Sequence, residues 1–309
     1  MPAPRAWAKA RVWGFSFARE PLRVTVLTIL LLLPLLWLQR SRMETLKMNR
    51  LEECGPFCAL PKPNFVWIQH VQRAAGTWLC ATALDNLGGD FDLAAEDDYT
   101  CEPFVNGARL TAYSSLDNAA LIQLGLKYKV LASQWESFDP RFFEMRSRGA
   151  AFVAVVREPF ERLCSWMHYA RPKYTLSNLT GFIERRLDNP MVRMFAKSAV
   201  TARNVTEEHL IEAQNVLSQF DKVILQEDLA RGHFGPNVWG WSFNLSDRVN
   251  ERPNMDSVGV PSCRSRMSVV DQSRVDARLV WDQRFFKFAQ ALVATRDVCC
   301  GVVGKLFKT

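Results

Sequence analysis

The sequence contains no internal repeat, no nucleic-acid-binding motif and no low-complexity tract outside one apolar run. These absences argue against a repeat protein and against a DNA- or RNA-binding protein. The formal net charge of +7 favours smaller anionic partners: a nucleotide, an acidic glycan or a membrane face. Cys54 and Cys58 have no second cysteine pair at zinc spacing, so we expect no zinc site.

Only one long stretch of the chain, Val24–Leu38, lacks charge and is mostly apolar. As a helix its 15 residues would span roughly 22 Å, and Arg23 and Arg40 at its ends can snorkel toward the surfaces of a bilayer about 30 Å thick. Residues 39–42, which follow it, contain no small-x-small cleavage site. The run therefore predicts an uncleaved signal anchor; a cleaved signal peptide and a buried helix are the alternatives.

The basic N-terminal side predicts a single-pass type II membrane protein. Residues 1–22 would form a cytoplasmic tail, 23–39 the transmembrane helix, 40–60 a stem and 61–309 a lumenal domain. All eight cysteines follow the anchor, as expected in an oxidising compartment: Cys54, Cys58, Cys80, Cys101, Cys164, Cys263, Cys299 and Cys300. Glycosylation sequons begin at Asn178, Asn204 and Asn244.

Short apolar runs alternate with helical patterns along the predicted lumenal domain. The strand candidates are Phe65–Gln69, Lys129–Ala132, Ala151–Val156 and Lys222–Leu225. The helix candidates are Thr77–Asn86, Pro159–Tyr169, Glu207–Gln219 and Ser273–Ala294. This alternation predicts an α/β fold with a central parallel sheet, whose ligands bind at the carboxyl ends of the strands.

The loop after the first predicted strand, "HVQRAAGT", has the composition of an anion-binding turn. Ala74, Ala75 and Gly76 have almost no side chain, so backbone N–H groups can approach a phosphate closely. Thr77 would begin a helix, where the dipole favours an anion, and Arg73 adds a positive charge. No lysine follows Gly76, unlike in a nucleotide-triphosphate loop. A tight turn that binds nothing is the alternative interpretation.

The loop after the third predicted strand, "REPFERLCS", repeats this pattern. Arg157 stands at the strand's end, Pro159 suits the first turn of a helix, and Ser165 lies one turn after Arg162. Arg157 and Ser165 could therefore converge on one phosphate. In the alternative interpretation, Arg157 is solvated, and Glu158 and Arg162 form an ion pair at i,i+4.

Together the two loops resemble motifs of the sulfotransferases that use 3′-phosphoadenosine 5′-phosphosulfate, most closely the membrane-anchored carbohydrate (heparan-sulfate-type) enzymes of the Golgi. The family's "HxPKxGGT" is matched at His70, Gly76 and Thr77, and its "RxPxxRxxS" at Arg157, Pro159, Arg162 and Ser165. Two later segments, "FDKVILQEDL" and "WDQRFFKFAQALV", are similar to a later strand and the last helix of the family. The resemblance implies a P-loop-like three-layer fold.

The resemblance also implies how the donor is held. The first loop would contact the 5′-phosphosulfate, and the second would hold the 3′-phosphate. The donor-binding residues would be Arg73, Ala74, Ala75, Gly76, Thr77, Trp78, Arg157 and Ser165. No metal is expected.

Two departures from the family concern catalysis. Arg73 replaces the family's lysine, and its charge could still stabilise the leaving phosphate. Gln134 stands where many relatives have a histidine, and it cannot take a proton at neutral pH. The candidate bases are His70, Glu136 and the acidic cluster Glu96–Asp98, while His168 is expected to be structural. Arg73, His70 and Glu136 are the predicted catalytic residues.

The predicted function is transfer of a sulfuryl group from 3′-phosphoadenosine 5′-phosphosulfate to a hydroxyl of an acceptor, with a carbohydrate as the expected acceptor. The enzyme alternative is a type II membrane glycosyltransferase that uses Asp90 and Asp92 to hold a divalent metal. The non-enzyme alternative is a sulfotransferase-like protein that binds a glycan or a partner without turnover.

Overall fold

The computed structural model describes residues 62–72, 74–87, 101, 104–105, 108–109, 113–134, 136–169, 188–229, 264 and 267–306. The chain divides into two units, Met1–Glu53 and Cys54–Thr309, and every described residue belongs to the second. The predicted tail, anchor and stem lie outside the described residues. Among the helices that the structure does describe, none is long and apolar enough to cross a membrane.

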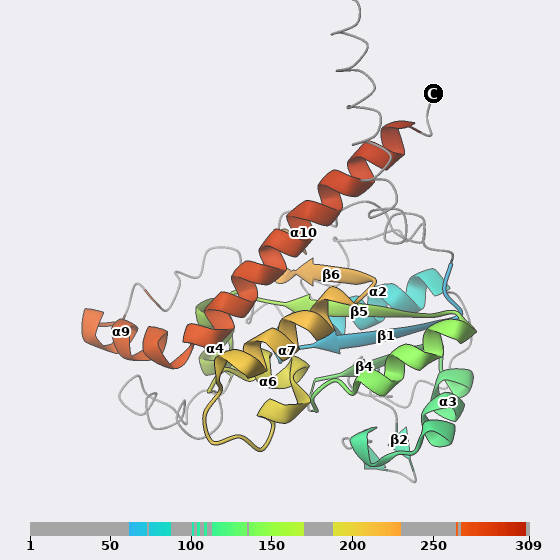
Figure 1. Cartoon of the computed structure of the whole chain (residues 1–309), viewed down its shortest axis with the longest axis horizontal. Helices are drawn as coiled ribbons and strands as arrows, with labels where there is room; N and C mark the ends of the chain where they lie inside the picture. Colours follow the sequence, from blue (N-terminus) through green and yellow to red (C-terminus); the bar gives the residue numbers. More distant parts are fainter. Residues whose placement is uncertain are drawn as a thin grey trace, which may run out of the picture. The chain divides into compact units, whose positions relative to one another are not determined.

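Four parallel strands form the central sheet, in the order β4-β1-β5-β6 (Figure 1). Their bounds are β1 Phe65–His70, β4 Val130–Ser133, β5 Ala150–Val156 and β6 Lys222–Leu225. All four predicted strands are thus confirmed within one residue at each end. Their residues are almost all buried, as expected for parallel strands covered on both faces. The predicted α/β fold with a central parallel sheet is confirmed.

Helices connect these strands. Their bounds are α2 Gly76–Leu87, α3 Asn118–Lys127, α4 Pro159–Tyr169, α6 Pro190–Phe195, α7 Glu207–Ser218, α8 Gln226–Leu229, α9 Val269–Arg278 and α10 Val280–Leu306. Three 3-10 segments, η1 Tyr113–Ser115, η2 Pro140–Arg148 and η4 Lys197–Ala199, and a small hairpin of β2 Phe104–Val105 and β3 Ala108–Arg109 complete the described elements. Of the predicted helices, α2, α4 and α7 are confirmed within one residue at each end.

The predicted helix Ser273–Ala294 is wrong, because two helices occupy that range. Helix α9 ends at Arg278, and the N–H of the following residue, Leu279, donates to the carbonyls of Val275 and Asp276. Helix α10 then begins at Val280. Backbone N–H groups in the first turn of α10 donate hydrogen bonds to the side-chain oxygen of Asn189. Asn189 is about ninety residues away in sequence, so local periodicity cannot reveal this break.

Opposite faces of β1 contact different helices, because successive side chains of a strand point to opposite sides. On one face, Trp67 stacks on Phe142 of η2 with ring centroids 4.1 Å apart, and Gln69 contacts Met194 of α6. On the other face, His70 packs beneath Gly76 at the start of α2. Helical elements therefore cover the sheet on both faces.

Helix α4 is fixed by a second, smaller apolar cluster. Its residues Phe160 and Leu163 are fully buried in a cluster with Val275 of α9 and Leu279, which follows α9. The guanidinium of Arg264 lies 4.6 Å from the ring centroid of Phe160, a cation–π distance. This packing fixes the orientation of α4, the helix that carries Arg162 and Ser165.

Candidate functional site

The connections of β1 and β5 leave these neighbouring strands in opposite directions. Strand β1 continues through α2 toward β4 on one side of the sheet, and β5 continues through α4 toward β6 on the other. Such a topological switch point, at the carboxyl ends of the strands, is where open α/β sheets bind ligands. The two loops singled out in the sequence both begin there (Figure 1).

The first loop makes a tight turn into α2. The N–H of Ala74 donates to the carbonyl of Val71 at 3.1 Å, and Ala75 adopts a left-handed φ of 61°. An alanine in this region costs about 1–2 kcal/mol relative to glycine. The turn brings the first N–H groups of α2 to the carboxyl edge of the sheet. Trp78 is half-buried on the first turn of that helix.

His70 supports this turn from below. Its ring is buried, and a Cβ atom added to Gly76 would overlap it, which explains the need for glycine at that position. Burial lowers the pKa of His70 to about 4, with a weak opposing effect of the Val71 carbonyl 3.4 Å from Nδ1. The imidazole is therefore neutral at neutral pH and lies under the loop.

The second loop is fixed at Glu158, the residue before α4. The carboxylate of Glu158 accepts a hydrogen bond from the N–H of Glu161 at 2.6 Å, as a helix N-cap does. The backbone N–H of Glu158 donates to Oε1 of Glu227 at 2.8 Å. The alternative interpretation, an ion pair between Glu158 and Arg162, is wrong, because the Glu158 carboxylate caps the helix instead.

Arg162 is a fully buried guanidinium on α4, with 1% of its surface exposed. Within the described part of the chain, its Nε and Nη2 atoms have no hydrogen-bond partner. Burial is the main cause that lowers the pKa of Arg162; Asp282 opposes this shift and the nearby charge of Arg157 adds to it. One turn further on, Ser165 is also buried. Two positive charges thus lie close together beside the second loop, and such a site favours an anion.

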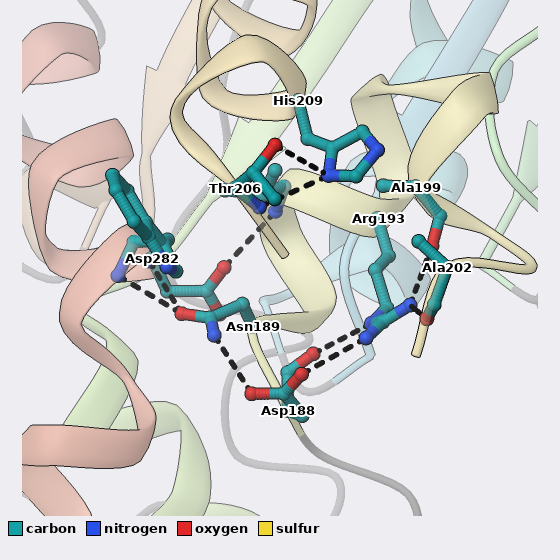
Figure 2. Close-up of polar contacts among 10 residues, drawn as sticks. Asp188, Asn189, Arg193, Ala199, Ala202, Thr206, His209 and Asp282 are labelled. Carbon is teal, nitrogen blue, oxygen red and sulfur yellow. Dashed lines mark hydrogen bonds and ion pairs between the residues drawn. The ribbon is translucent and has the colours of Figure 1, made fainter. Parts of the chain in front are cut away.

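Asp282, the acid whose charge acts on Arg162, is not among the site residues predicted from the sequence. Its two carboxylate oxygens accept hydrogen bonds from the backbone N–H groups of Met191 and Val192, at 3.1 and 3.0 Å. In the opposite direction, the side-chain oxygen of Asn189 accepts hydrogen bonds from the N–H groups of Trp281 and Asp282 (Figure 2). Asp282 is therefore bound to the start of α6, and within the described part of the chain none of its hydrogen bonds goes to Arg162. The only local signal was an acid in the first turn of a helix.

The end of β4 reaches the same edge of the sheet. Gln134 directly follows β4 and is half-buried. The carbonyl of Glu136 accepts a hydrogen bond from Nε2 of buried Gln69 at 3.0 Å, while Trp67 donates to Oε1 of Gln69 at 3.1 Å. These contacts link the backbone of Glu136 to Gln69 of β1, which directly precedes His70.

Several predicted residues lie outside the part that the structure describes. These are Arg73, the side chains of Thr77 and His168, the acidic cluster Glu96–Asp98, the pair Asp90 and Asp92, and the sequons at Asn178 and Asn244. Among the described residues, no cluster of three or more His, Cys, Asp or Glu side chains could hold a metal ion.

A disulfide between Cys80 and Cys101 attaches α2 to the segment beside β4. Cys101 is buried, and its carbonyl accepts a hydrogen bond from the N–H of Ala132 at 2.9 Å. Cys164, Cys299 and Cys300 are disulfide-bonded as well. No cysteine in the described ranges is free.

No protein-family model matches the chain, and no curated protein matches it.

Proposed function

We propose that the protein transfers a sulfuryl group from 3′-phosphoadenosine 5′-phosphosulfate to a hydroxyl of a carbohydrate, on a P-loop-like three-layer fold. The observation that carries this proposal is the pairing of the two loops on neighbouring strands at the switch point. One loop leads into the start of α2, and the other carries Arg157 ahead of Arg162 and Ser165. A donor with phosphate groups at both ends of one nucleoside suits two adjacent anion sites.

In this proposal the first loop holds the 5′-phosphosulfate. The N–H groups at the start of α2 and the side chain of Thr77 would donate to it, beside Ala74, Ala75 and Gly76. Arg73 would lie against the bridging oxygen and stabilise the charge that develops on the leaving phosphate. Trp78 follows on the same helix and completes the donor-binding segment.

The second loop would hold the 3′-phosphate through Arg157 and Ser165. The buried charge of Arg162 supports this assignment, because its Nε and Nη2 atoms have no protein partner in the described part and Asp282 is bound to α6. An anion beside these two arginines would offset the free energy that the buried positive charge costs.

The chemical step would be an in-line displacement. The acceptor oxygen forms a bond to sulfur while the bond between sulfur and the phosphate oxygen breaks, and 3′-phosphoadenosine 5′-phosphate leaves. The acceptor hydroxyl gives up its proton to a base. Glu136, at the end of β4, and His70 are the candidates among the described residues. Burial lowers the pKa of His70 to about 4, which makes its imidazole a weak base and favours a supporting role under the loop, so Glu136 is the stronger candidate.

We also propose that the protein is a single-pass type II protein of the Golgi membrane with its body in the lumen. The disulfide between Cys80 and Cys101 supports an oxidising compartment. The basic N-terminus and the apolar run Val24–Leu38 support the orientation.

Two other functions compete with this one. A glycosyltransferase would need a sugar nucleotide as its donor and a manganese ion, and Asp90 and Asp92 would hold the metal ion. A protein that binds glycans without catalysis would bind the nucleotide, if at all, without transfer. A sulfation screen over an acceptor panel with labelled donor, with and without chelator, separates the three functions.

Arg157→Ala tests the nucleotide site directly. Loss of a charged hydrogen-bonding partner costs about 1.5–3 kcal/mol, so affinity for 3′-phosphoadenosine 5′-phosphate should fall about 10- to 150-fold by calorimetry. Affinity for adenosine 5′-phosphate, which lacks the 3′-phosphate, should change little. Arg148→Ala is the matched control, because exposed Arg148 precedes the opposite, amino end of β5. An equal loss for both nucleotides would contradict the assignment.

A further inference from the structure

Glu227 connects two strands at the point where their pairing ends. Strands β5 and β6 pair as far as Val156 and Leu225, after which the chain of β6 turns into α8. Beyond this point no backbone hydrogen bond of the ladder joins the two described segments. Instead, Oε1 of the Glu227 side chain accepts a hydrogen bond from the N–H of Glu158 at 2.8 Å. Since Glu158 follows Arg157 directly, this hydrogen bond holds the backbone next to the proposed 3′-phosphate ligand.

The two oxygens of Glu227 have different roles. Oε1 makes the hydrogen bond to the loop, whereas Oε2 is buried and has no hydrogen-bond partner among the described residues. Burial is the main cause that raises the pKa of Glu227; the N–H of Glu158 and the charge of Arg157 oppose it, and the Glu158 carboxylate adds to it. Oε2 has no hydrogen bond of its own among the described residues, and in its ionised form the Glu227 carboxylate would place a negative charge near Arg157.

We propose that Glu227 is a positioning residue of the nucleotide site. Its hydrogen bond to Glu158 fixes Arg157 for the 3′-phosphate, and its charge weakens the hold of the two arginines on that phosphate. Weaker binding lets the product nucleotide leave, a step that limits turnover in many enzymes. This inference rests on the proposed function, since it names the ligand of the same site.

Two substitutions separate the hydrogen bond from the charge. Glu227→Gln keeps an oxygen that can accept from the Glu158 N–H but removes the charge. Its affinity for 3′-phosphoadenosine 5′-phosphate should rise about tenfold at neutral pH. Glu227→Ala removes both, so the same affinity should fall about tenfold or more. Asp228→Asn, which removes the neighbouring acid of α8, is the control and should change affinity less than about twofold. Calorimetry on the full-length protein measures all three.

Opposite changes for the two variants, seen only with the 3′-phosphorylated nucleotide, are the expected result. Equal losses for both variants, or equal effects on adenosine 5′-phosphate, would overturn the role of the charge. Hydrogen exchange at the Glu158 amide tests positioning without any ligand. Exchange should speed up in Glu227→Ala and stay slow in Glu227→Gln; unchanged exchange in Glu227→Ala would overturn the positioning role. If the wild-type protein binds neither nucleotide, the proposed function fails, and the exchange result still decides whether Glu227 fixes the loop.

Discussion

At the scale of single residues, Gly76 and His70 depend on each other. The imidazole occupies the space that any side chain at position 76 would need. Gly76→Ala should therefore lower the free energy of unfolding by about 1–3 kcal/mol, the usual cost of overpacking a buried site. Urea denaturation of the variant measures this loss as a lower midpoint.

The double variant Gly76→Ala/His70→Ala is the control for this clash. Removing the imidazole makes room for the new methyl group, so the alanine at position 76 should cost much less in this background. A coupling free energy of about 1 kcal/mol or more between the two sites is expected for residues in direct contact. Strictly additive losses would show that Gly76 is required for another reason.

At the scale of elements, two arginines bind the carboxyl end of α7. Arg296 of α10 donates to the carbonyls of Phe220 and Ser218 at 2.8 and 2.7 Å, and Arg146 of η2 donates to the carbonyl of Gln219. Arg146 also pairs with Asp221 at 3.3 Å. Cations at a helix C-terminus are favourable because the last carbonyls have no partner within the helix.

Arg296→Ala should therefore lower the free energy of unfolding by about 2–3 kcal/mol, since it removes two charged hydrogen bonds from a half-buried site. Arg284→Ala on the same helix is the matched control. Its ion pair with Glu207 is half-exposed, at 2.8 Å, and such pairs contribute about 0–1 kcal/mol. Similar losses for the two variants in urea denaturation would contradict the role of the α7 end.

The contact between α6 and α10 should make stability depend on pH through Asp282. Burial is the main cause that raises the pKa of Asp282 from 3.8 to about 6; Arg162 and the N–H groups of Met191 and Val192 oppose it, and Asp188 adds to it. Between these values the folded state binds more protons than the unfolded state, so this contribution to stability falls as pH rises.

Asp282→Asn removes this titration. We compare the free energy of unfolding of the wild-type protein with that of the variant. This difference should fall by up to about 3 kcal/mol from pH 4 to pH 7, because each unit of pKa shift corresponds to about 1.4 kcal/mol. The lowered pKa of His70, about 4, has the opposite effect on stability and cancels in this comparison. Urea denaturation over this pH range provides the measurement, and a constant difference would contradict the shift.

At the scale of the whole molecule, the disulfide between Cys80 and Cys101 joins the helix of the first loop to the segment beside β4. It closes a loop with a sequence separation of 21 residues. By its effect on the unfolded chain, such a cross-link contributes about 3 kcal/mol. Cys80→Ala/Cys101→Ala should lower the free energy of unfolding by about this amount in oxidising buffer. In reducing buffer the difference from the wild-type protein should disappear, and a difference that persists would mean that lost packing causes it.

Some elements had local signals in the sequence that were not used. Helix α3 begins after Asp117, whose side chain accepts from the N–H of Ala120 at 2.7 Å. Segment η2 begins after Asp139 with Pro140 in its first turn. Both are standard start signals, so α3 and η2 could have been predicted from the sequence.

The sequence by itself determined the four strands, because a parallel strand buried on both faces must be a continuous apolar run. It also placed Gly76 at the start of α2, Arg157 directly before α4 and Ser165 within α4, since a loop of small residues and Pro159 mark such helix starts locally. Only the tertiary structure decided that Glu158 caps α4 instead of pairing with Arg162, that Asn189 starts α10, and that Glu227 binds the second loop. The latter two interactions join residues 69 to 93 positions apart, and no local pattern of side chains records a partner at that distance.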